Sequence, residues 1–130
     1  MPPKKILVVD DHLDTRFICR ELLTHFGYEV SEAIDGVQAY DVAVENPPHL
    51  ILLDFLMPNS DGQQTLEKLR AHDGLKNTRI VLYTAAATQM EALRKLTGVE
   101  RVLLKPLESR HLLQVVRELI GPAELAPPAV

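Results

Sequence analysis

Leu50-Ile51-Leu52-Leu53-Asp54 is a run of four apolar residues that leads directly into a carboxylate. An apolar run without alternation is typical of a strand buried on both faces, as in parallel sheets covered by helices. Three other runs have the same form and end in polar residues: 6–9 before Asp10 and Asp11, 80–83 before Thr84, and 102–104 before Lys105. The carboxyl ends of parallel strands share one edge of the sheet. We therefore expect these side chains to converge into a site for a phosphoryl group and a metal ion.

The size and charge of the chain exclude several classes of protein. The 130 residues, 46% of them hydrophobic, suit one compact domain. The formal net charge of -4 and the lack of a basic stretch beyond Lys4-Lys5 argue against direct binding of nucleic acid. No apolar stretch approaches the roughly 20 residues of a membrane span, and the N-terminus lacks a signal-peptide pattern. We expect a cytoplasmic protein without membrane contact.

Segments of helical periodicity separate the apolar runs. We expect a further strand over 28–33. The five expected helices cover residues 13–26, the segment from Asp35 as N-cap to Asn46, the segment from Gly62 through Leu69, residues 88–96, and the segment from Ser109 as N-cap to Gly121. Five strands alternating with five helices predict an α/β, flavodoxin-like, doubly wound parallel sheet of order 2-1-3-4-5. Residues 1–121 form the predicted domain, and 122–130 a tail rich in Pro and Ala or the start of a linker.

The helical stripes identify candidate core residues. We expect the first helix to bury Ile18, Cys19, Leu22 and Phe26, with Cys19, the only cysteine, acting as a small core residue. The second helix places Val37, Tyr40, Ala43 and Val44 on one face. The five histidines show no ligand spacing, so we interpret each of them as a solvated surface residue.

The chain resembles the receiver domain of two-component response regulators over roughly residues 5–120. The matching motifs are Ile6 to Asp11, Glu32 to Gly36, Leu52 to Pro58, Asp61-Gly62, Thr84-Ala85 and Lys105-Pro106. The resemblance implies that Asp54 is the phosphoacceptor, Thr84 the switch hydroxyl and Lys105 the phosphate-binding lysine. It also implies an Mg²⁺ site. We expect its ligands to be Asp11, Asp54 and the backbone carbonyl of Leu56, with Asp10 acting through water.

By the same resemblance, the protein is a signalling protein that takes a phosphoryl group from a sensor histidine kinase or a phosphotransfer protein. Its output partner or domain is unknown, a homodimer is left open, and the fourth helix, fifth strand and fifth helix would report phosphorylation.

The family usually has an aromatic switch residue three positions before its lysine, where this chain has Val102. Pro106 implies a cis peptide bond after the lysine. Leu56 and Ala86 are apolar at the positions that control water access, which predicts slow self-dephosphorylation.

Other functions fit the residues less well. An aspartyl-phosphate phosphatase requires a second Asp two residues after its nucleophile, and His12 and Leu13 stand there. A flavodoxin-type flavin carrier binds phosphate after its first strand, where this loop is acidic. A P-loop is excluded because no Gly-Lys-Ser/Thr sequence is present. The main alternative is a pseudo-receiver, an interaction module that is never phosphorylated. It is disfavoured because the chain retains all five reactive or metal-binding side chains: Asp10, Asp11, Asp54, Thr84 and Lys105.

Overall fold

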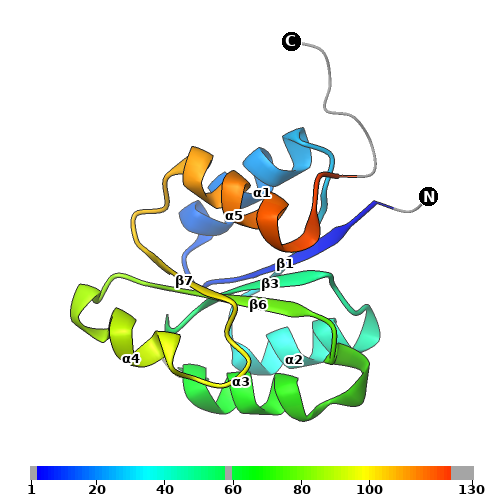
Figure 1. The fold of residues 1–130 in the computed structure, drawn as a ribbon. Coiled ribbons are helices and arrows are strands. Elements are labelled where there is room, and N and C mark those ends of the chain that lie inside the picture. Colours follow the sequence, from blue (N-terminus) through cyan, green and yellow to red (C-terminus); the bar gives the residue numbers. More distant parts are fainter. Residues whose placement is uncertain (1–2, 58–59, 124–130) are drawn as a thin grey trace.

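The central element is a five-stranded parallel sheet, seen in a computed structural model that describes residues 3–57 and 60–123 (Figure 1). Its strands, in spatial order, are β2 (Glu29–Ala33), β1 (Lys5–Val9), β3 (Leu50–Asp54), β6 (Arg79–Thr84) and β7 (Arg101–Leu104). Every pairing between neighbouring strands is parallel. This confirms the predicted order 2-1-3-4-5, which places the first and third main strands side by side.

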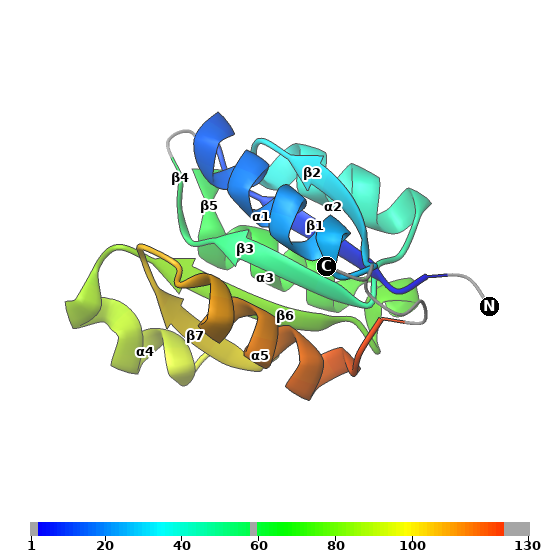
Figure 2. The ribbon, with the colours of Figure 1, turned by 90° about the horizontal axis from the view of Figure 1, so that it is seen from above.

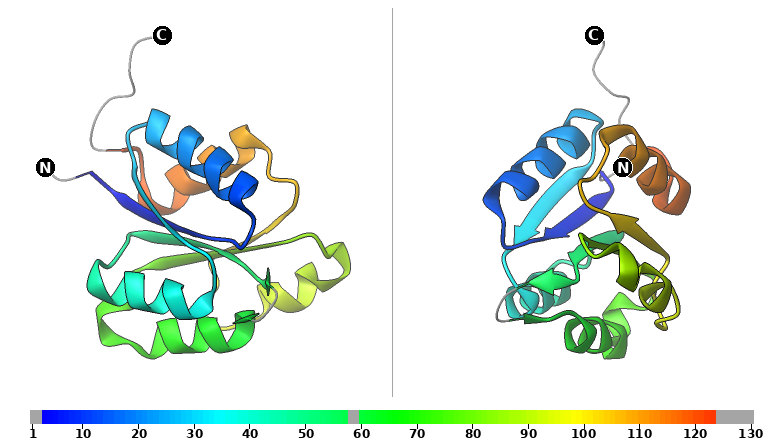
Figure 3. Two further views of the ribbon diagram at one scale, coloured as in Figure 1. Left: turned by 180° about the vertical axis from the view of Figure 1, so that it is seen from behind. Right: turned by 90° about the vertical axis from the view of Figure 1, so that its left-hand side faces the viewer.

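Helices cover both faces of the sheet (Figures 1 and 3). One layer contains α1 (Leu13–His25) and α5 (Ser109–Ile120), which lie on the same face in Figure 2. The other layer contains α2 (Gly36–Glu45), α3 (Gly62–Ala71) and the short α4 (Met90–Arg94). Two separate apolar clusters result, one on each side of the sheet. Among the described residues, none of the helices is long and apolar enough to cross a membrane.

Local sequence explains where the helices around the site begin. The side chain of Asp35 accepts a hydrogen bond from the Gln38 backbone at 2.8 Å, as predicted for an N-cap. Asp61 caps α3 in the same way, accepting from the backbone of Gln63 and Gln64. The prediction for Ser109 is wrong, because Ser109 is already helical and the N-cap position belongs to Glu108, whose side chain makes no capping bond.

Several segments are more finely divided than the apolar pattern indicates. Leu56–Met57 (β4) and Ser60–Asp61 (β5) pair as a small antiparallel hairpin soon after β3, and the intervening Pro58 and Asn59 lie outside the described residues. Single turns of 3-10 helix occupy Asp73–Leu75 and Ala87–Gln89, so α4 is shorter than the predicted 88–96. Most of the predicted C-terminal tail, from residue 124 onward, also lies outside the described residues, and the domain boundary stays a prediction.

The predicted core faces of helices α1 and α2 are partly wrong. Ile18 is 59% exposed and Val37 is 70% exposed, although both were expected in the core. In α1 the sheet contact is made by Cys19 and Leu23, and residue 18 lies roughly 100° around the helix axis from residue 19. A helix packed flat on a sheet buries only a narrow stripe, and an extra apolar residue beside that stripe faces solvent. The core assignment of Cys19 is confirmed, since 2% of its surface is exposed.

Candidate functional site

The carboxyl ends of four parallel strands position the chemically capable side chains. Asp10 directly follows β1, Asp54 is the last residue of β3, Thr84 is the last residue of β6, and Lys105 directly follows β7. The backbone of Lys105 donates a hydrogen bond to the carbonyl of Thr84 at 2.8 Å, which fixes the end of β7 beside β6. The structure therefore brings residues from distant parts of the sequence to one edge of the sheet, as the apolar runs predicted.

Lys105 links the two buried carboxylates. Its Nζ lies 3.0 Å from Asp54 Oδ2 and 3.2 Å from Asp10 Oδ2. Asp10 and Asp54 are almost fully buried, while 20% of the Lys105 side chain is exposed. One ammonium compensates only one of the two charges, and Asp11 adds a third carboxylate nearby. The site therefore keeps a net negative charge that favours a cation.

Both oxygens of Asp10 are held by the protein. Oδ2 accepts a hydrogen bond from the hydroxyl of Tyr83 at 2.6 Å in addition to the Lys105 contact. Oδ1 accepts from the backbone of His12 at 2.8 Å. Burial is the strongest single influence on the pKa of Asp10 and raises it, but these hydrogen bonds and the Lys105 charge together outweigh burial and keep the pKa below its ordinary value. Asp10 is thus a fixed, ionised carboxylate.

Asp11 is held differently. Its Oδ1 is buried and accepts no hydrogen bond, and the His12 ring lies beside it, with Nδ1 at 3.3 Å. A buried carboxylate oxygen without a donor is costly unless a ligand supplies the missing contact. One ligand atom each from Asp10, Asp11, His12 and Asp54 lie within 4.8 Å of one another. Carboxylate oxygens are what Mg²⁺ prefers, so the residues present fit this ion.

His12 modifies one expectation from the sequence. Its side chain is 67% exposed, as predicted, but its Nδ1 also lies 3.2 Å from Asp10 Oδ1. An imidazole therefore borders the acidic pair, although the spacing of the histidines gave no sign of a ligand. The neighbouring backbone explains this position, because the turn after β1 directs the carboxylate of Asp10 toward the amide of His12.

The environment of Asp54 suits a carboxylate that reacts. Burial raises the pKa of Asp54, the Lys105 hydrogen bond and charge lower it, and the negative charge of Asp10 raises it again, with a net rise. The amide of Leu56 donates to Oδ1 at 3.2 Å, so both oxygens are oriented. Burial lowers the pKa of Lys105, but its contacts with Asp54 and Asp10 outweigh burial and raise it. The lysine is therefore held in its charged form.

Of the predicted switch residues, Thr84 lies next to Lys105 at the ends of β6 and β7, whereas Val102 lies two residues before the end of β7. Thr84 is fully buried, and its Oγ1 accepts a hydrogen bond from the backbone of Ala86 at 3.1 Å, while Ala85 is exposed. Val102 is 8% exposed and belongs to the apolar cluster under α4 that also contains Leu93. The Lys105-Pro106 peptide bond is cis.

Tyr83 is a site residue that the sequence analysis missed. It was counted as the apolar end of a strand, yet its hydroxyl contacts Asp10 and its ring centroid lies 4.8 Å from Lys105 Nζ. Its surface is completely buried. A signal was present, because a tyrosine in an otherwise aliphatic buried strand needs a partner for its hydroxyl.

A doubly wound α/β fold whose carboxyl edge carries three aspartates and a lysine defines a class of receiver-like domain. The chain belongs to the response regulator receiver domain family, whose family model matches residues 6–117. It is thus a signalling domain of two-component systems, which confirms the resemblance seen in the sequence.

Individual relatives agree with this assignment. The transcriptional regulatory protein SrrA of Staphylococcus aureus is 33% identical over 117 residues, covering 89% of this chain and 47% of SrrA. The chain therefore spans about half the length of the curated relatives it matches. Among solved structures, the chemotaxis protein CheY4 of Vibrio cholerae has a TM-score of 0.83 at 28% identity, covering 90% of this chain and 98% of CheY4.

A third relative is informative about the metal. The receiver domain of the sensor histidine kinase PA1611 from Pseudomonas aeruginosa PAO1 has a TM-score of 0.82 at 28% identity. The match covers 91% of this chain and 98% of that domain. That structure contains a magnesium ion coordinated in the active site cleft.

Proposed function

We propose that this chain accepts a phosphoryl group on Asp54 from a phosphohistidine of a sensor histidine kinase or a phosphotransfer protein, in an Mg²⁺-dependent reaction. The observation that carries the proposal is the bridging position of Lys105, whose ammonium contacts both Asp54 and Asp10. These residues lie at the carboxyl ends of the strands, an edge of the sheet that keeps excess negative charge and is called the rim below. An ion pair that served stability alone would need one carboxylate for the lysine, whereas two contact Lys105 and a third, Asp11, lies near those two.

Asp11, Asp54 and the backbone carbonyl of Leu56 would hold the Mg²⁺ ion, and Asp10 would act through water. The hydrogen bonding supports Asp11 as a direct ligand, because its Oδ1 is buried and has no protein donor. When bound, Mg²⁺ offsets the carboxylate charges and neutralises a phosphoryl oxygen.

In the transfer step, a carboxylate oxygen of Asp54 attacks the phosphorus of the phosphohistidine. The new P–O bond forms as the P–N bond breaks, and the imidazole leaves with the electron pair of that bond and gains a proton. Lys105 then exchanges its contact with Asp54 Oδ2 for one with a phosphoryl oxygen. Positioning and charge neutralisation supply the catalysis, as in other phosphoryl transfers.

The apolar surface of α1 supports docking of a kinase beside Asp54. Leu13 is 67% exposed, and Phe17 and Ile18 are each 59% exposed. Leu13 and Phe17 are four residues apart and therefore share one face of a helix that begins just after Asp11. Exposed apolar side chains grouped next to a reactive carboxylate are typical of a protein contact.

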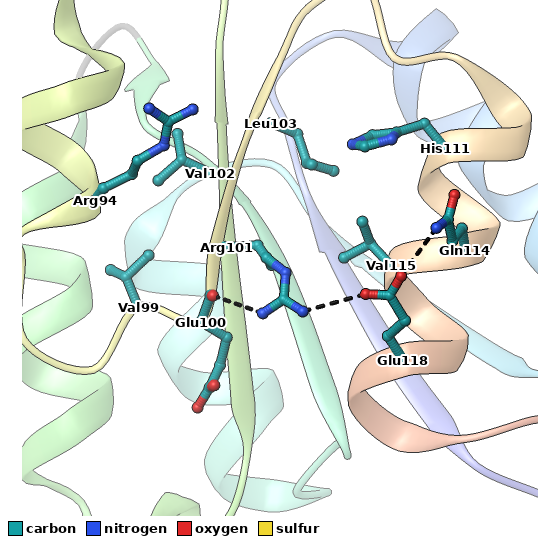
Figure 4. Close-up of a pocket in the computed structure, with 10 residues that line it drawn as sticks. All are labelled: Arg94, Val99, Glu100, Arg101, Val102, Leu103, His111, Gln114, Val115 and Glu118. Carbon is teal, nitrogen blue, oxygen red and sulfur yellow. Dashed lines mark hydrogen bonds and ion pairs between the residues drawn. The ribbon is translucent and has the colours of Figure 1, made fainter.

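The readout is proposed to use Thr84 and the surface formed by α4, β7 and α5. A phosphoryl group adds charge and three acceptors, and the Thr84 hydroxyl would turn to donate to one of them. A groove of about 390 Å³ lies on this surface, and Arg101 of β7 pairs there with Glu118 of α5 at 3.2 Å. Figure 4 shows the residues that line it. Val102, in place of an aromatic switch residue, is 8% exposed and lines this groove.

Dephosphorylation is proposed to be slow. Leu56 is 47% exposed at the rim, and Ala86 is half-buried in the loop after Thr84. Neither side chain has a polar atom that could orient an attacking water molecule. The acyl phosphate would therefore persist for many minutes or longer.

The proposal is tested with acetyl phosphate as a small phosphodonor. We expect intact-protein mass spectrometry to show one added phosphoryl group with Mg²⁺ present, and none after chelation or in Asp54→Ala. Circular dichroism verifies that the variant is folded. A folded wild-type protein that gains no phosphoryl mass would contradict the proposal and favour the pseudo-receiver, an interaction module that is not phosphorylated.

A further inference from the structure

Tyr83 contacts two different members of the rim. Its hydroxyl donates to Asp10 Oδ2 at 2.6 Å and lies 3.2 Å from the carbonyl oxygen of Val9. Its ring lies under the Lys105 ammonium at 4.8 Å. A phenol has one proton, and the shorter, charge-assisted contact with the carboxylate is the stronger of the two. Tyr83 is therefore a buried donor committed to Asp10.

We propose that Tyr83 is a positioning residue for divalent-cation binding at this rim, acting through the carboxylate of Asp10. The inference rests on the proposed function to the extent that the rim binds Mg²⁺. It assigns a role to a side chain that contacts no phosphoryl group and no expected metal ligand other than Asp10.

The chemistry of the donor explains why a tyrosine suits this position. Asp10 Oδ2 already receives the charged Lys105, and a second cationic donor would cancel the negative charge that a metal ion requires. A neutral hydroxyl fixes the carboxylate without reducing its charge. Groups that orient metal-binding carboxylates in this way typically contribute about 10- to 100-fold to metal affinity.

The ring has a second, separable effect. An ammonium over an aromatic face is stabilised by the electrostatics of the ring. Replacement by phenylalanine keeps this contact and the packing in the sheet, so Tyr83→Phe removes the hydroxyl alone. Since Asp10 retains Lys105 and the His12 amide, we expect a loss at the lower end of the range, about tenfold in Mg²⁺ affinity.

Tyr28 provides the matched control. It is also buried, with 3% of its surface exposed, and its hydroxyl donates to the carbonyl of Gly121 at 2.8 Å. It directly precedes β2 and therefore lies at the amino ends of the parallel strands, whereas the rim lies at their carboxyl ends. Tyr28→Phe loses one buried hydrogen bond of similar length without touching Asp10.

The test measures Mg²⁺ binding directly by isothermal titration calorimetry, without any phosphodonor, on wild type, Tyr83→Phe and Tyr28→Phe. All three are compared well below their unfolding temperatures. We expect the dissociation constant to rise about tenfold in Tyr83→Phe and to stay within twofold of wild type in Tyr28→Phe. In phosphorylation by acetyl phosphate, the Mg²⁺ concentration for half-maximal rate should shift by the same factor, while the rate at saturating Mg²⁺ stays near the wild-type value.

Several results would overturn the inference. Unchanged Mg²⁺ affinity in Tyr83→Phe, or an equal loss in Tyr28→Phe, would show that the hydroxyl serves the core alone. A rate defect that saturating Mg²⁺ does not rescue would also contradict a role in metal binding. Absence of Mg²⁺ binding by wild type would remove the metal premise of the proposed function and this inference with it, whereas wild-type binding with unchanged Tyr83→Phe affinity overturns this inference alone.

Discussion

Replacement of Lys105 by methionine should destabilise the metal-free protein and make its stability strongly dependent on Mg²⁺. Lys105 Nζ lies 3.0 and 3.2 Å from carboxylates that are almost completely buried. Removing one partner of a buried ion pair costs roughly 3–5 kcal/mol. Because 20% of the Lys105 side chain is exposed, we reduce this figure to about 2–3 kcal/mol, or roughly 10 °C in melting temperature for a domain of this size.

Added Mg²⁺ should reverse most of this loss. A ligand at about 100 times its dissociation constant stabilises the native state by about 2.7 kcal/mol. The Lys105→Met variant should gain more than wild type at equal Mg²⁺, because the ammonium no longer repels the ion. Thermal unfolding in chelator and in Mg²⁺ measures both effects, with Lys68→Met, at an exposed position on α3, as the control. Equal stability of Lys105→Met and wild type in chelator, or equal gains in Mg²⁺, would refute this reasoning.

The same variant has a predictable pH dependence. The pKa of Asp54 is raised in the folded protein, mainly by burial. The contribution of this carboxyl to folding stability is therefore complete below its pKa in the unfolded chain, about 4, and is lost as pH rises through its pKa in the folded protein. Loss of the Lys105 charge raises this pKa further. The stability deficit of Lys105→Met should therefore be largest near neutral pH and shrink as pH falls toward about 4. A deficit that grows on acidification would contradict this sign.

Three further predictions address other parts of the structure. Burial raises the pKa of the Cys19 thiol to about 11, so a thiol reagent such as DTNB should not react in the native protein at pH 8 but should react fully in urea; rapid native reaction would contradict the burial. Gly62→Ala should cost about 1–3 kcal/mol in urea unfolding, because the added Cβ would lie 2.6 Å from the carbonyl oxygen of Phe55, and an unchanged midpoint would refute this close contact. Phe17→Ser should slow phosphotransfer from a cognate kinase while leaving the rate with acetyl phosphate unchanged, and equal effects on both donors would argue against docking at α1.

The fold was predictable because four of the five main strands are short apolar runs that lead into a polar residue. All five residues of β3 are buried and the first four are apolar, and such apolar runs are distinctive of a covered parallel sheet. The convergence of Asp10, Asp54 and Lys105 follows from the same topology. Helix faces were less predictable, as Ile18 and Val37 show, because apolar residues on a helix can serve either the core or an exposed surface.

The missed parts of the site depend on side-chain geometry. Tyr83 and His12 reach the carboxylate of Asp10 only because of the register between β1, β3 and β6 and the turn after β1. No periodicity encodes that contact. The hairpin β4 and β5 likewise depends on pairing of only two residues on each side, which is too short to produce a sequence pattern.

The most direct test of the central claim is chemical mapping of the phosphorylated residue. The protein is phosphorylated with acetyl phosphate and Mg²⁺, and the acyl phosphate is then reduced with borohydride, which converts a phosphorylated aspartate into homoserine. We predict homoserine at position 54 in peptide mass spectrometry, with unchanged aspartate at positions 10 and 11. Homoserine at position 10 or 11, or none at position 54 in a protein that has gained phosphoryl mass, would contradict the account.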